Sequence, residues 1–380
     1  MWKQLALLWL FGLCLRLTVL AVPPVIPLIH GSLSLSQAEV GALVSLPVLL
    51  FSFAAIPGSL LIARFGAPGI LAAGLLITAA ASALRGASFD TATLFAATFF
   101  MGAGIAIMQP ALPAIVRSTM PERVALGSAV FANGLLVSEA LSSSLTIPFV
   151  LPAVGGSWRL SLVFWSVPVL LVALIAWREA RRYPSPVGAA RQLAWPEWRS
   201  PLTWRLGALS GGSSSLYFTA NAFLPDWLHR LGRDDLLNDA LASINWAQLP
   251  ASFILLAFSR HLMLRRWPLV VLGLVGGVAI LALHALPQGG IVFWSGVIGF
   301  CTAFLLIVTL ALPPLLVPAE EVHRTSAATL AIGYFCALVT PIVGGLLWDL
   351  TGKPWAAFAP AGLFGIIIAV AAFRPWPAAR

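Results

Sequence analysis

The sequence predicts an all-α membrane protein, with twelve transmembrane helices in two pseudo-symmetric six-helix bundles. Hydrophobic residues make up 60% of the chain and charged residues only 9%, with a mean hydropathy of +0.96. A soluble chain of this composition would have too few polar residues to cover its surface. The apolar runs are about 18 to 25 residues long, which suits helices that cross a bilayer and exceeds the length of barrel strands.

Clusters of charged residues, Gly and Pro separate the apolar runs and divide the chain into twelve predicted helices. These cover residues 5–29, 38–62, 68–87, 91–116, 125–151, 160–177, 203–228, 239–259, 268–286, 290–316, 325–348 and 355–373. The one long hydrophilic interval, 178–202, carries five Arg among several Pro and is predicted to be a cytoplasmic linker. We therefore expect an N-terminal six-helix bundle over 1–177 and a C-terminal one over 203–380.

The net charge of +9 comes mostly from basic residues in short loops between the spans. We interpret this pattern as a signal of membrane orientation and expect no nucleic acid as a partner. If the N-terminus is inside, sixteen of the 22 Lys and Arg residues fall on that side, five fall on the other, and Arg16 remains within the membrane. Basic residues favour the cytoplasmic side. The pattern predicts a multi-pass protein of the bacterial inner membrane, a monomer surrounded by lipid, with both termini in the cytoplasm.

The two halves share short motifs, as an internal duplication would leave behind. Ala-Leu-Pro at 111–113 recurs at 311–313, in the fourth and tenth predicted helices. Ile26-Pro27 near the end of the first helix has a counterpart in Leu224-Pro225 near the end of the seventh. Together these matches favour a pair of similar bundles.

Arg16 is the single charge in the first predicted helix and lies near its middle. A cation halfway through a bilayer-spanning helix costs a few kcal/mol on insertion scales, and such residues usually face a polar cavity or a partner. We interpret Arg16 as the floor of a binding site for a negatively charged solute. A structural ion pair inside a helix bundle is the alternative.

Glu139 is the only acidic residue deep in a predicted span, and it lies in the fifth helix. Burial favours the neutral form of a carboxylate and a nearby Arg favours the ionised form, so this residue could gain and lose a proton as its surroundings change. Three readings remain open, namely coupling to protons or substrate, a fixed pair with Arg16, and other polar packing.

Polar residues within the spans are further candidates for contacts with a substrate. The seventh helix has an unusually polar passage, 210–215, followed by Tyr217 and Asn221, which lie four residues apart and share one helix face. The other candidates, in helices 4, 5 and 8, are Gln109, Asn133, Asn245, Trp246 and Gln248. Each is about as suited to a hydrogen bond between helices as to a ligand.

Catalysis finds little support in this sequence. His30, His229, His261, His284 and His323 lie at or near span ends without a partner at ligand spacing. The motifs of zinc proteases, serine hydrolases and phosphate-binding loops are missing. We therefore expect no enzyme, no catalytic residue, no metal and no cofactor, and an ATP-driven pump is disfavoured.

Several motifs resemble those of the major facilitator superfamily. Residues 59–66, Ser-Leu-Leu-Ile-Ala-Arg-Phe-Gly, are a degenerate form of the loop that follows the second helix in that family, with Ala63 in place of its usual acidic residue. Within the superfamily, Arg16-Leu17-Thr18 followed by Pro23 and Pro27, Gln-Pro-Ala-Leu-Pro at 109–113 and the run 333–352 look like the cyanate permease and 2-nitroimidazole transporter branch.

This resemblance implies that helices 1, 4, 7 and 10 surround a central cavity and that helices 2, 5, 8 and 11 lie where the halves meet. Arg16 and Tyr217 would then lie on cavity helices, and Glu139 on a neighbouring interface helix. The fifth helix departs from the cyanate-type pattern, because Ser and Glu at 138–144 stand where Gly is more frequent. Cyanate itself is therefore not predicted as the substrate.

These observations predict a secondary active transporter that moves a small anionic or polar solute by alternating access, with the proton as coupling ion. Arg16, Gln109, Asn133, Tyr217 and Asn221 would bind the substrate, and Glu139 would carry the proton. One alternative is an exporter of uncharged drugs such as nitroimidazoles, in which Arg16 is merely paired. Another is a membrane receptor that binds a ligand without transporting it.

Overall fold

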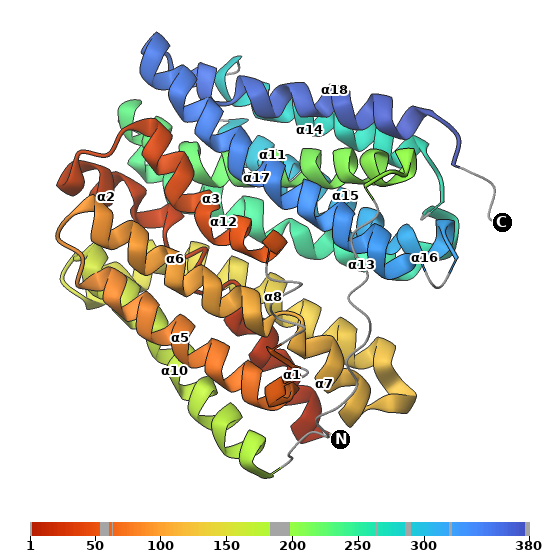
Figure 1. Cartoon of the computed structure of the whole chain (residues 1–380). Coiled ribbons are helices and arrows are strands. Elements are labelled where there is room, and N and C mark those ends of the chain that lie inside the picture. The colour runs from red at the N-terminus through yellow and green to blue at the C-terminus, as the bar shows by residue number, and fades with distance from the viewer. Residues whose placement is uncertain are drawn as a thin grey trace. The chain divides into compact units, whose positions relative to one another are not determined.

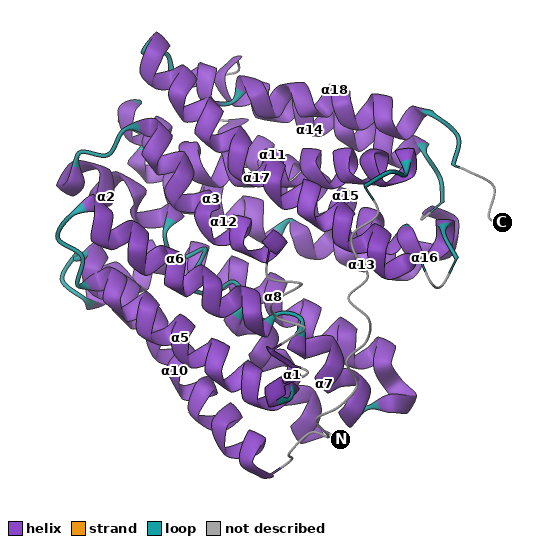
Figure 2. Ribbon diagram, viewed as in Figure 1, coloured by secondary structure: helices purple, strands orange, loops and turns teal. Residues whose placement is uncertain are grey.

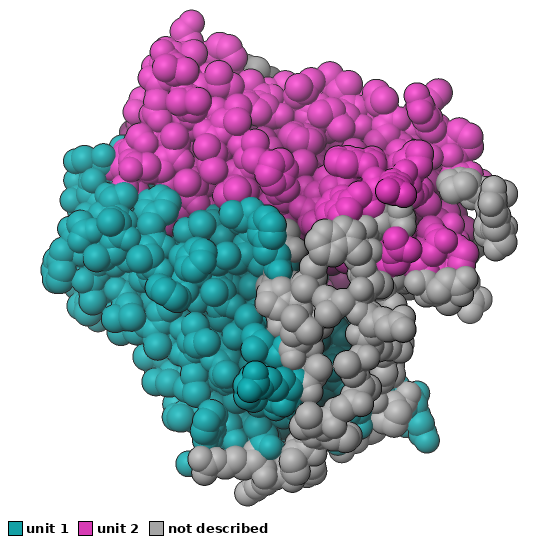
Figure 3. Space-filling view, viewed as in Figure 1, with its two compact units in different colours: residues 1–34, 46–193 teal, residues 35–45, 194–380 magenta. Residues whose placement is uncertain are grey.

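The computed structural model describes residues 2–53, 61–62, 64–182, 198–262, 264–285, 290–318 and 321–376. Within these ranges the regular structure is helical and contains no strand (Figure 2). Two compact units make up the chain, unit 1 with residues 1–34 and 46–193 and unit 2 with residues 35–45 and 194–380 (Figure 3).

Unit 1 is built from the helices that precede the predicted linker (Figure 1). They are α1 (Trp2–Cys14), α2 (Ile26–Leu33), the second half of α3 (Gln37–Phe53), α5 (Ala67–Gly86), α6 (Thr91–Met108), α7 (Ala111–Thr119), α8 (Val124–Leu145), α9 (Leu151–Ala153) and α10 (Trp158–Arg182). Short 3-10 turns occupy Pro23–Val25 (η1) and Pro121–Arg123 (η2), and a π-helical turn, η3 (Thr146–Val150), joins α8 to α9.

Unit 2 contains the first half of α3 and the helices that follow the predicted linker (Figure 1). They are α11 (Pro201–Arg230), α12 (Leu237–Trp246), α13 (Gln248–Leu262), α14 (Trp267–Ala285), α15 (Ile291–Ala311), α16 (Pro313–Leu316), α17 (Val322–Thr351) and α18 (Ala359–Phe373). The 3-10 turns η4 (Asp234–Leu236) and η6 (Pro354–Ala357) precede α12 and α18.

The helices confirm the prediction of twelve spans. Eight helical segments of the described chain are long and apolar enough to cross a membrane. The other four spans are the α1–α2 pair, α3, the α12–α13 pair and the polar helix α11. Of the second predicted span, 38–62, residues 54–60 lie outside the described part of the chain, as do residues 59, 60 and 63 of the loop 59–66.

Several spans are interrupted where the sequence analysis predicted continuous helices. In the first span, residues 15–22 form turns between α1 and η1, because Pro23 and Pro24 have no amide hydrogen to donate to the preceding turn. The fourth span breaks at Gln109-Pro110 and the tenth at Leu312, directly before Pro313. The two Ala-Leu-Pro repeats therefore fall at matching breaks, in α6–α7 and in α15–α16.

Close contact between α1 and α8 brings the first and fifth spans together in unit 1. A Cβ atom at Gly12 would collide with the carbonyl oxygen of Phe131, and one at Gly134 would collide with the carbonyl oxygen of Trp9. The two helices can approach this closely only because each has Gly at the crossing. The crossing sets Arg16, shortly after α1, near the second half of α8.

The boundary between the bundles falls close to the predicted linker. The two compact units meet in sequence between residues 193 and 194, while residues 183–197 of the predicted linker lie outside the described part of the chain. Residues 35–45 group with unit 2, although they begin the second span of the N-terminal half. The bundle limits 1–177 and 203–380 stay a prediction.

Candidate functional site

The charged centre of unit 1 is the ion pair of Arg16 and Glu139. Nε of Arg16 lies 3.5 Å from Oε1 of Glu139, and the two side chains are 10% and 5% exposed. The guanidinium carbon of Arg16 also lies 5.1 Å from the ring centroid of Phe51, over its face. The structure thus brings together the two buried charges that the sequence singled out.

The length of this contact matters for what the pair can do. A charge-assisted hydrogen bond is about 2.7 to 2.9 Å long, so at 3.5 Å these two atoms, Nε and Oε1, are in ion-pair contact. A buried guanidinium needs a negative charge beside it in a low dielectric. In this structure the Glu139 carboxylate supplies that charge.

Asn133 and Gln109 occupy different positions in unit 1. Oδ1 of Asn133 accepts a hydrogen bond of 3.0 Å from Nε1 of Trp9, so this side chain joins α8 to α1. Gln109 lies half-buried at the break between α6 and α7, where its backbone amide continues the ladder of α6 by donating to Ile105 at 3.0 Å. Asn133 is thus already used in helix packing, whereas Gln109 lies where the helix is interrupted.

In unit 2, a polar network connects α11 to the break between α12 and α13. The hydroxyl of Tyr217 donates to Oδ1 of Asn245 at 2.6 Å, and Nε2 of Gln248 donates to the same oxygen at 3.3 Å. All three residues are less than 10% exposed. Trp246, between the two amides in sequence, is 43% exposed. The sequence had suggested Tyr217, Asn245 and Gln248 singly, without their mutual contact.

Asn221 is completely buried one turn after Tyr217 on α11. Its Nδ2 atom donates to the backbone carbonyl of Tyr217 at 3.0 Å. Its Oδ1 atom finds no hydrogen-bond donor among the described residues. A buried amide oxygen without a donor is costly, so it is a candidate to accept a hydrogen bond from a ligand or a water molecule.

The start of α3 is fixed by a group of contacts that sequence reasoning missed. Ser36 and Glu39 form a capping box, with bonds of 2.7 Å from the Ser36 amide to Oε2 of Glu39 and 3.2 Å from the Glu39 amide to Oγ of Ser36. The amides of Gln37 and Ala38 each donate at 3.0 Å to a carboxylate oxygen of Asp349, at the end of α17.

The Gln37 side chain adds a contact to α11, because its Nε2 atom donates to Oδ2 of Asp226 at 3.0 Å. Gly345 allows the close approach, since a Cβ atom there would collide with the carbonyl oxygen of Gln37. We call these contacts of Gln37 and Ala38 with Asp226 and Asp349 the α3 clamp. In sequence, its members look like ordinary polar residues at span ends.

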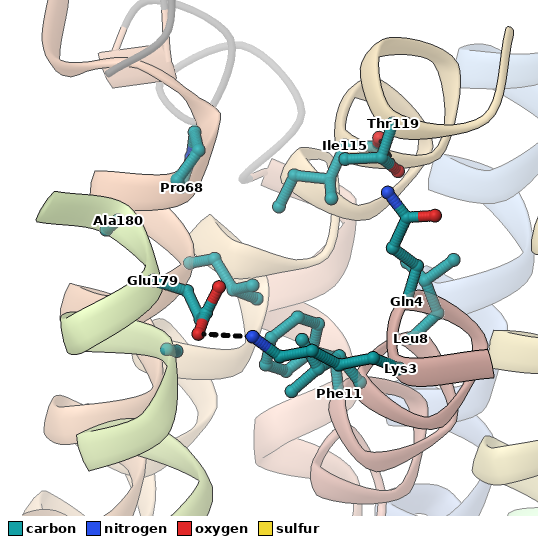
Figure 4. Close-up of a pocket in the computed structure, with 12 residues that line it drawn as sticks. Lys3, Gln4, Leu8, Phe11, Pro68, Ile115, Thr119, Glu179 and Ala180 are labelled. Atoms are coloured by element: carbon teal, nitrogen blue, oxygen red, sulfur yellow. Dashed lines mark hydrogen bonds and ion pairs between the residues drawn. The ribbon is translucent and has the colours of Figure 1, made fainter. Parts of the chain in front are cut away.

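A pocket of ≈ 170 Å³ lies in unit 1 among α1, α5, α7 and α10 (Figure 4). Its lining is mostly apolar, and two of the lining residues, Lys3 and Glu179, form an ion pair 3.0 Å long. None of the predicted site residues lines it. The described residues also contain no group of three His, Cys, Asp or Glu side chains placed to hold a metal ion.

Twelve membrane spans in two helical units, with buried polar groups inside the spans, define a multi-pass membrane protein of the transporter class. The chain matches the sequence profile of the major facilitator superfamily over residues 8–298. It belongs to this superfamily.

Three related proteins are similar over most of their length. The chain is 26% identical to the uncharacterized transporter YycB of Bacillus subtilis over 344 residues, which cover 89% of this chain and 84% of the relative. It is 25% identical to the 2-nitroimidazole transporter of Escherichia coli, with 94% and 91% covered. With the cyanate transport protein CynX of the same organism it shares 26% identity, with 98% and 97% covered.

Solved structures show the same fold at lower identity. The nucleoside transporter NupG has a TM-score of 0.75 at 13% identity, with 98% of each chain covered. A peptide transporter, POT, has a TM-score of 0.75 at 14% identity, covering 98% of this chain and 93% of that one. A bacterial homologue of the lysosomal transporter Spinster has a TM-score of 0.73 at 17% identity, with 97% and 94% covered. These likenesses confirm the twelve-helix major facilitator fold.

Proposed function

We propose that this protein is a secondary active transporter that carries a small anion by alternating access, with Arg16 as the anion ligand and Glu139 as the proton carrier. The ion pair of these two residues, 3.5 Å apart and largely buried, is the observation that carries the proposal. Membership of a transporter family supports the general class, and the relatives named for cyanate and 2-nitroimidazole support a small polar solute.

The coupling follows from charge balance around Arg16. When Glu139 is ionised, it compensates the guanidinium. When a proton neutralises Glu139, the guanidinium attracts another negative group, because an uncompensated charge is expensive in a low dielectric. A proton and an anion therefore enter together without adding net charge, which makes the protein a proton–anion symporter.

The other polar groups would orient the solute. Gln109 lies at a helix break in unit 1, and Tyr217 and Asn221 lie on α11 in unit 2 beside the amides of Asn245 and Gln248. Broken helices at membrane depth occur where they line a polar site, and transporters build substrate sites from them. Asn133 would contribute through the α1–α8 contact, since its amide oxygen is bonded to Trp9.

The α3 clamp lies within unit 2, where it holds the first half of α3 to α11 and α17. We place the protein in the bacterial inner membrane as a monomer with both termini in the cytoplasm, following the excess of basic residues on that side. No chemical conversion of the solute is involved.

The second candidate is an exporter of uncharged compounds such as nitroimidazoles. The same ion pair favours it, since Arg16 and Glu139 could simply neutralise each other in every state. In that case, aromatic and amide groups would hold the solute. This candidate predicts binding of 2-nitroimidazole, with no dependence on Arg16.

Reconstitution into liposomes tests the proposal. Uptake of labelled nitrate driven by an inwardly directed proton gradient, abolished by Arg16→Gln, is expected. Flux of 2-nitroimidazole that is equal in the wild type and in Arg16→Gln would favour the exporter. Binding of a solute in detergent without any flux would favour a receptor and overturn the proposal.

A further inference from the structure

The first span loses part of its helical hydrogen-bond ladder just after Arg16. In an α-helix, the carbonyl of Thr18 would accept from the amide of Val22. Here that amide donates to the carbonyl of Val19 at 3.4 Å instead. The carbonyl of Arg16 keeps its helical donor, the amide of Leu20, at 3.0 Å. One turn, 16–20, therefore persists, with the Thr18 carbonyl turned out of the ladder.

Arg85 supplies the donor that this carbonyl lacks. Its Nη2 atom donates to the carbonyl oxygen of Thr18 at 2.8 Å and to Oγ of Ser82 at 3.0 Å. The charge count placed Arg85 among the five basic residues on the outer side, at the end of the predicted helix 68–87, but its side chain is only 1% exposed. Within the described chain, no carboxylate forms an ion pair with it. It lies in the last turn of α5, where the carbonyl ends of a helix favour a positive charge.

We propose that Arg85 is a positioning residue for the anion site. Its bond to Thr18 holds the turn 16–20, and this turn carries the Arg16 side chain. Arg85 thus sets where the Arg16 guanidinium stands relative to Glu139 on α8. This inference rests on the proposed role of Arg16, while Arg85 itself touches neither Arg16 nor Glu139 in the contacts described.

Arg159 offers a matched control. Its Nε atom donates to the backbone carbonyl of Ser88 at 2.9 Å, so it too is a cation bound to a main-chain oxygen in unit 1. Ser88 lies just beyond the end of α5, whereas Thr18 lies in the broken part of the first span. If Arg85 merely anchors the end of α5, the two arginines should behave alike on substitution.

The first experiment needs no ligand. Amide hydrogen exchange of the purified protein is compared for the wild type, Arg85→Met and Arg159→Met. We expect exchange within residues 15–22 to become about tenfold faster in Arg85→Met, as loss of a hydrogen bond to a charged group implies. We expect wild-type exchange there in Arg159→Met. Unchanged protection of 15–22 in Arg85→Met would overturn the proposal.

The second experiment separates this inference from the proposed function. Nitrate is the probe, and its dissociation constant is measured by calorimetry for the wild type, Arg16→Gln, Arg85→Met and Arg85→Lys. We expect no binding by Arg16→Gln. We expect about tenfold weaker binding by Arg85→Met, in line with the loss of one hydrogen bond from a charged group. We expect partial recovery in Arg85→Lys, because an ammonium group can donate to a single carbonyl.

The outcomes are distinguishable. Wild-type affinity in Arg16→Gln would refute the anion site, while the exchange result would still decide whether Arg85 holds the turn. Loss of binding in Arg16→Gln with wild-type affinity in Arg85→Met would refute the positioning role alone. If Arg85→Met does not fold, the same comparison is made between Arg85→Gln and Arg159→Gln, and equal exchange within 15–22 in those two variants would overturn the proposal.

Discussion

The Nε atom of Arg16 lies 3.5 Å from Oε1 of Glu139, so that a broken segment of the first span and the second half of α8 share one pair of charges. Each charge compensates the other in a largely buried setting. Removal of one partner should therefore lower the stability of the protein more than removal of both, because removal of one leaves a lone buried charge. Comparing the stability of the single and double variants therefore tests whether the two charges compensate each other.

Substitution of Arg16 by Gln should abolish the binding of small anions while the protein stays folded. The variant leaves Glu139 without its cation, at a cost of about 3 to 5 kcal/mol unless the carboxylate takes up a proton. The double variant Arg16→Gln/Glu139→Gln should therefore be more stable than Arg16→Gln alone. Thermal shifts with cyanate and nitrate measure both effects, and a wild-type anion response in Arg16→Gln would contradict the proposed site.

Substitution of Glu139 by Gln should separate transport from the proton gradient. A neutral amide imitates the protonated carboxyl, so anions should still bind and exchange, while uptake should lose its dependence on pH. Exchange and gradient-driven uptake in liposomes at several pH values provide the measurement. Glu179→Gln, which removes a carboxylate paired with the exposed Lys3, is the control. Survival of normal pH dependence in Glu139→Gln would mean that the carboxylate is structural.

Substitution of Tyr217 by Phe should loosen the network in unit 2. It removes the 2.6 Å bond to Asn245 and leaves that buried oxygen with the longer contact from Gln248, at 3.3 Å. We expect a loss of about 1 to 2 kcal/mol in the free energy of unfolding. Unfolding in detergent is followed by denaturant titration of the wild type and of Tyr217→Phe. Equal stability of the two proteins would show that the Tyr217 hydroxyl adds nothing.

Substitution of Asp349 by Asn should weaken the α3 clamp. The amide removes the negative charge that faces the amino end of α3, an interaction that contributes about 0.3 to 1 kcal/mol at an exposed site. The readout is labelling of Val40→Cys, one turn into α3 and only 1% exposed, in a background without native cysteines. We expect faster labelling in Asp349→Asn.

The control for the clamp is Asp235→Asn. Asp235 is an exposed carboxylate whose pKa is held below its usual range by hydrogen bonds from Arg233, at 2.9 Å, outside the membrane. An exposed pair of this kind stabilises little, so labelling of Val40→Cys should not change. Identical labelling rates in the Asp349 and Asp235 variants would argue against a clamp that restrains α3.

Substitution of Gly134 by Ala should destabilise the α1–α8 crossing. The added methyl group would meet the Trp9 backbone, which cannot move aside as a side chain can. Overpacking of this kind costs about 1 to 3 kcal/mol. Gly69→Ala on α5 is the matched control, because nothing lies within 4 Å of a Cβ atom there. If both variants unfold at the wild-type temperature, the two helices do not cross as closely as described.

Hydropathy predicted the number and order of the spans, because the cost of exposing polar backbone in a bilayer dominates every local preference. The positions where helices break within a span were harder to predict from the sequence. Proline occurs in many spans, and Pro47, Pro168 and Pro341 lie inside helices that continue past them. Whether a Pro interrupts a span depends on whether neighbouring helices provide hydrogen-bond donors for the carbonyls that the break leaves without one. Arg85 provides such a donor for the carbonyl of Thr18.

The site was predictable residue by residue but not as a set of contacts. Arg16 and Glu139 stood out because charge is rare in spans, and their contact remained an open alternative until α1 and α8 were seen to cross. Tyr217 and Asn245 come from α11 and α12, whose relative register depends on side-chain packing. Asp349 and Asp226 gave no signal, since acidic residues at span ends are ordinary.

The polarity of α11 has a consequence for how the protein reaches the membrane. Its residues from Leu209 to Leu228 are buried within unit 2, against α15, α17 and α18, and it is not among the eight most apolar spans. Such a segment gains little by entering lipid alone. Since α15, α17 and α18 are synthesised after it, α11 should leave the translocation channel late, once these later segments have emerged to shelter it.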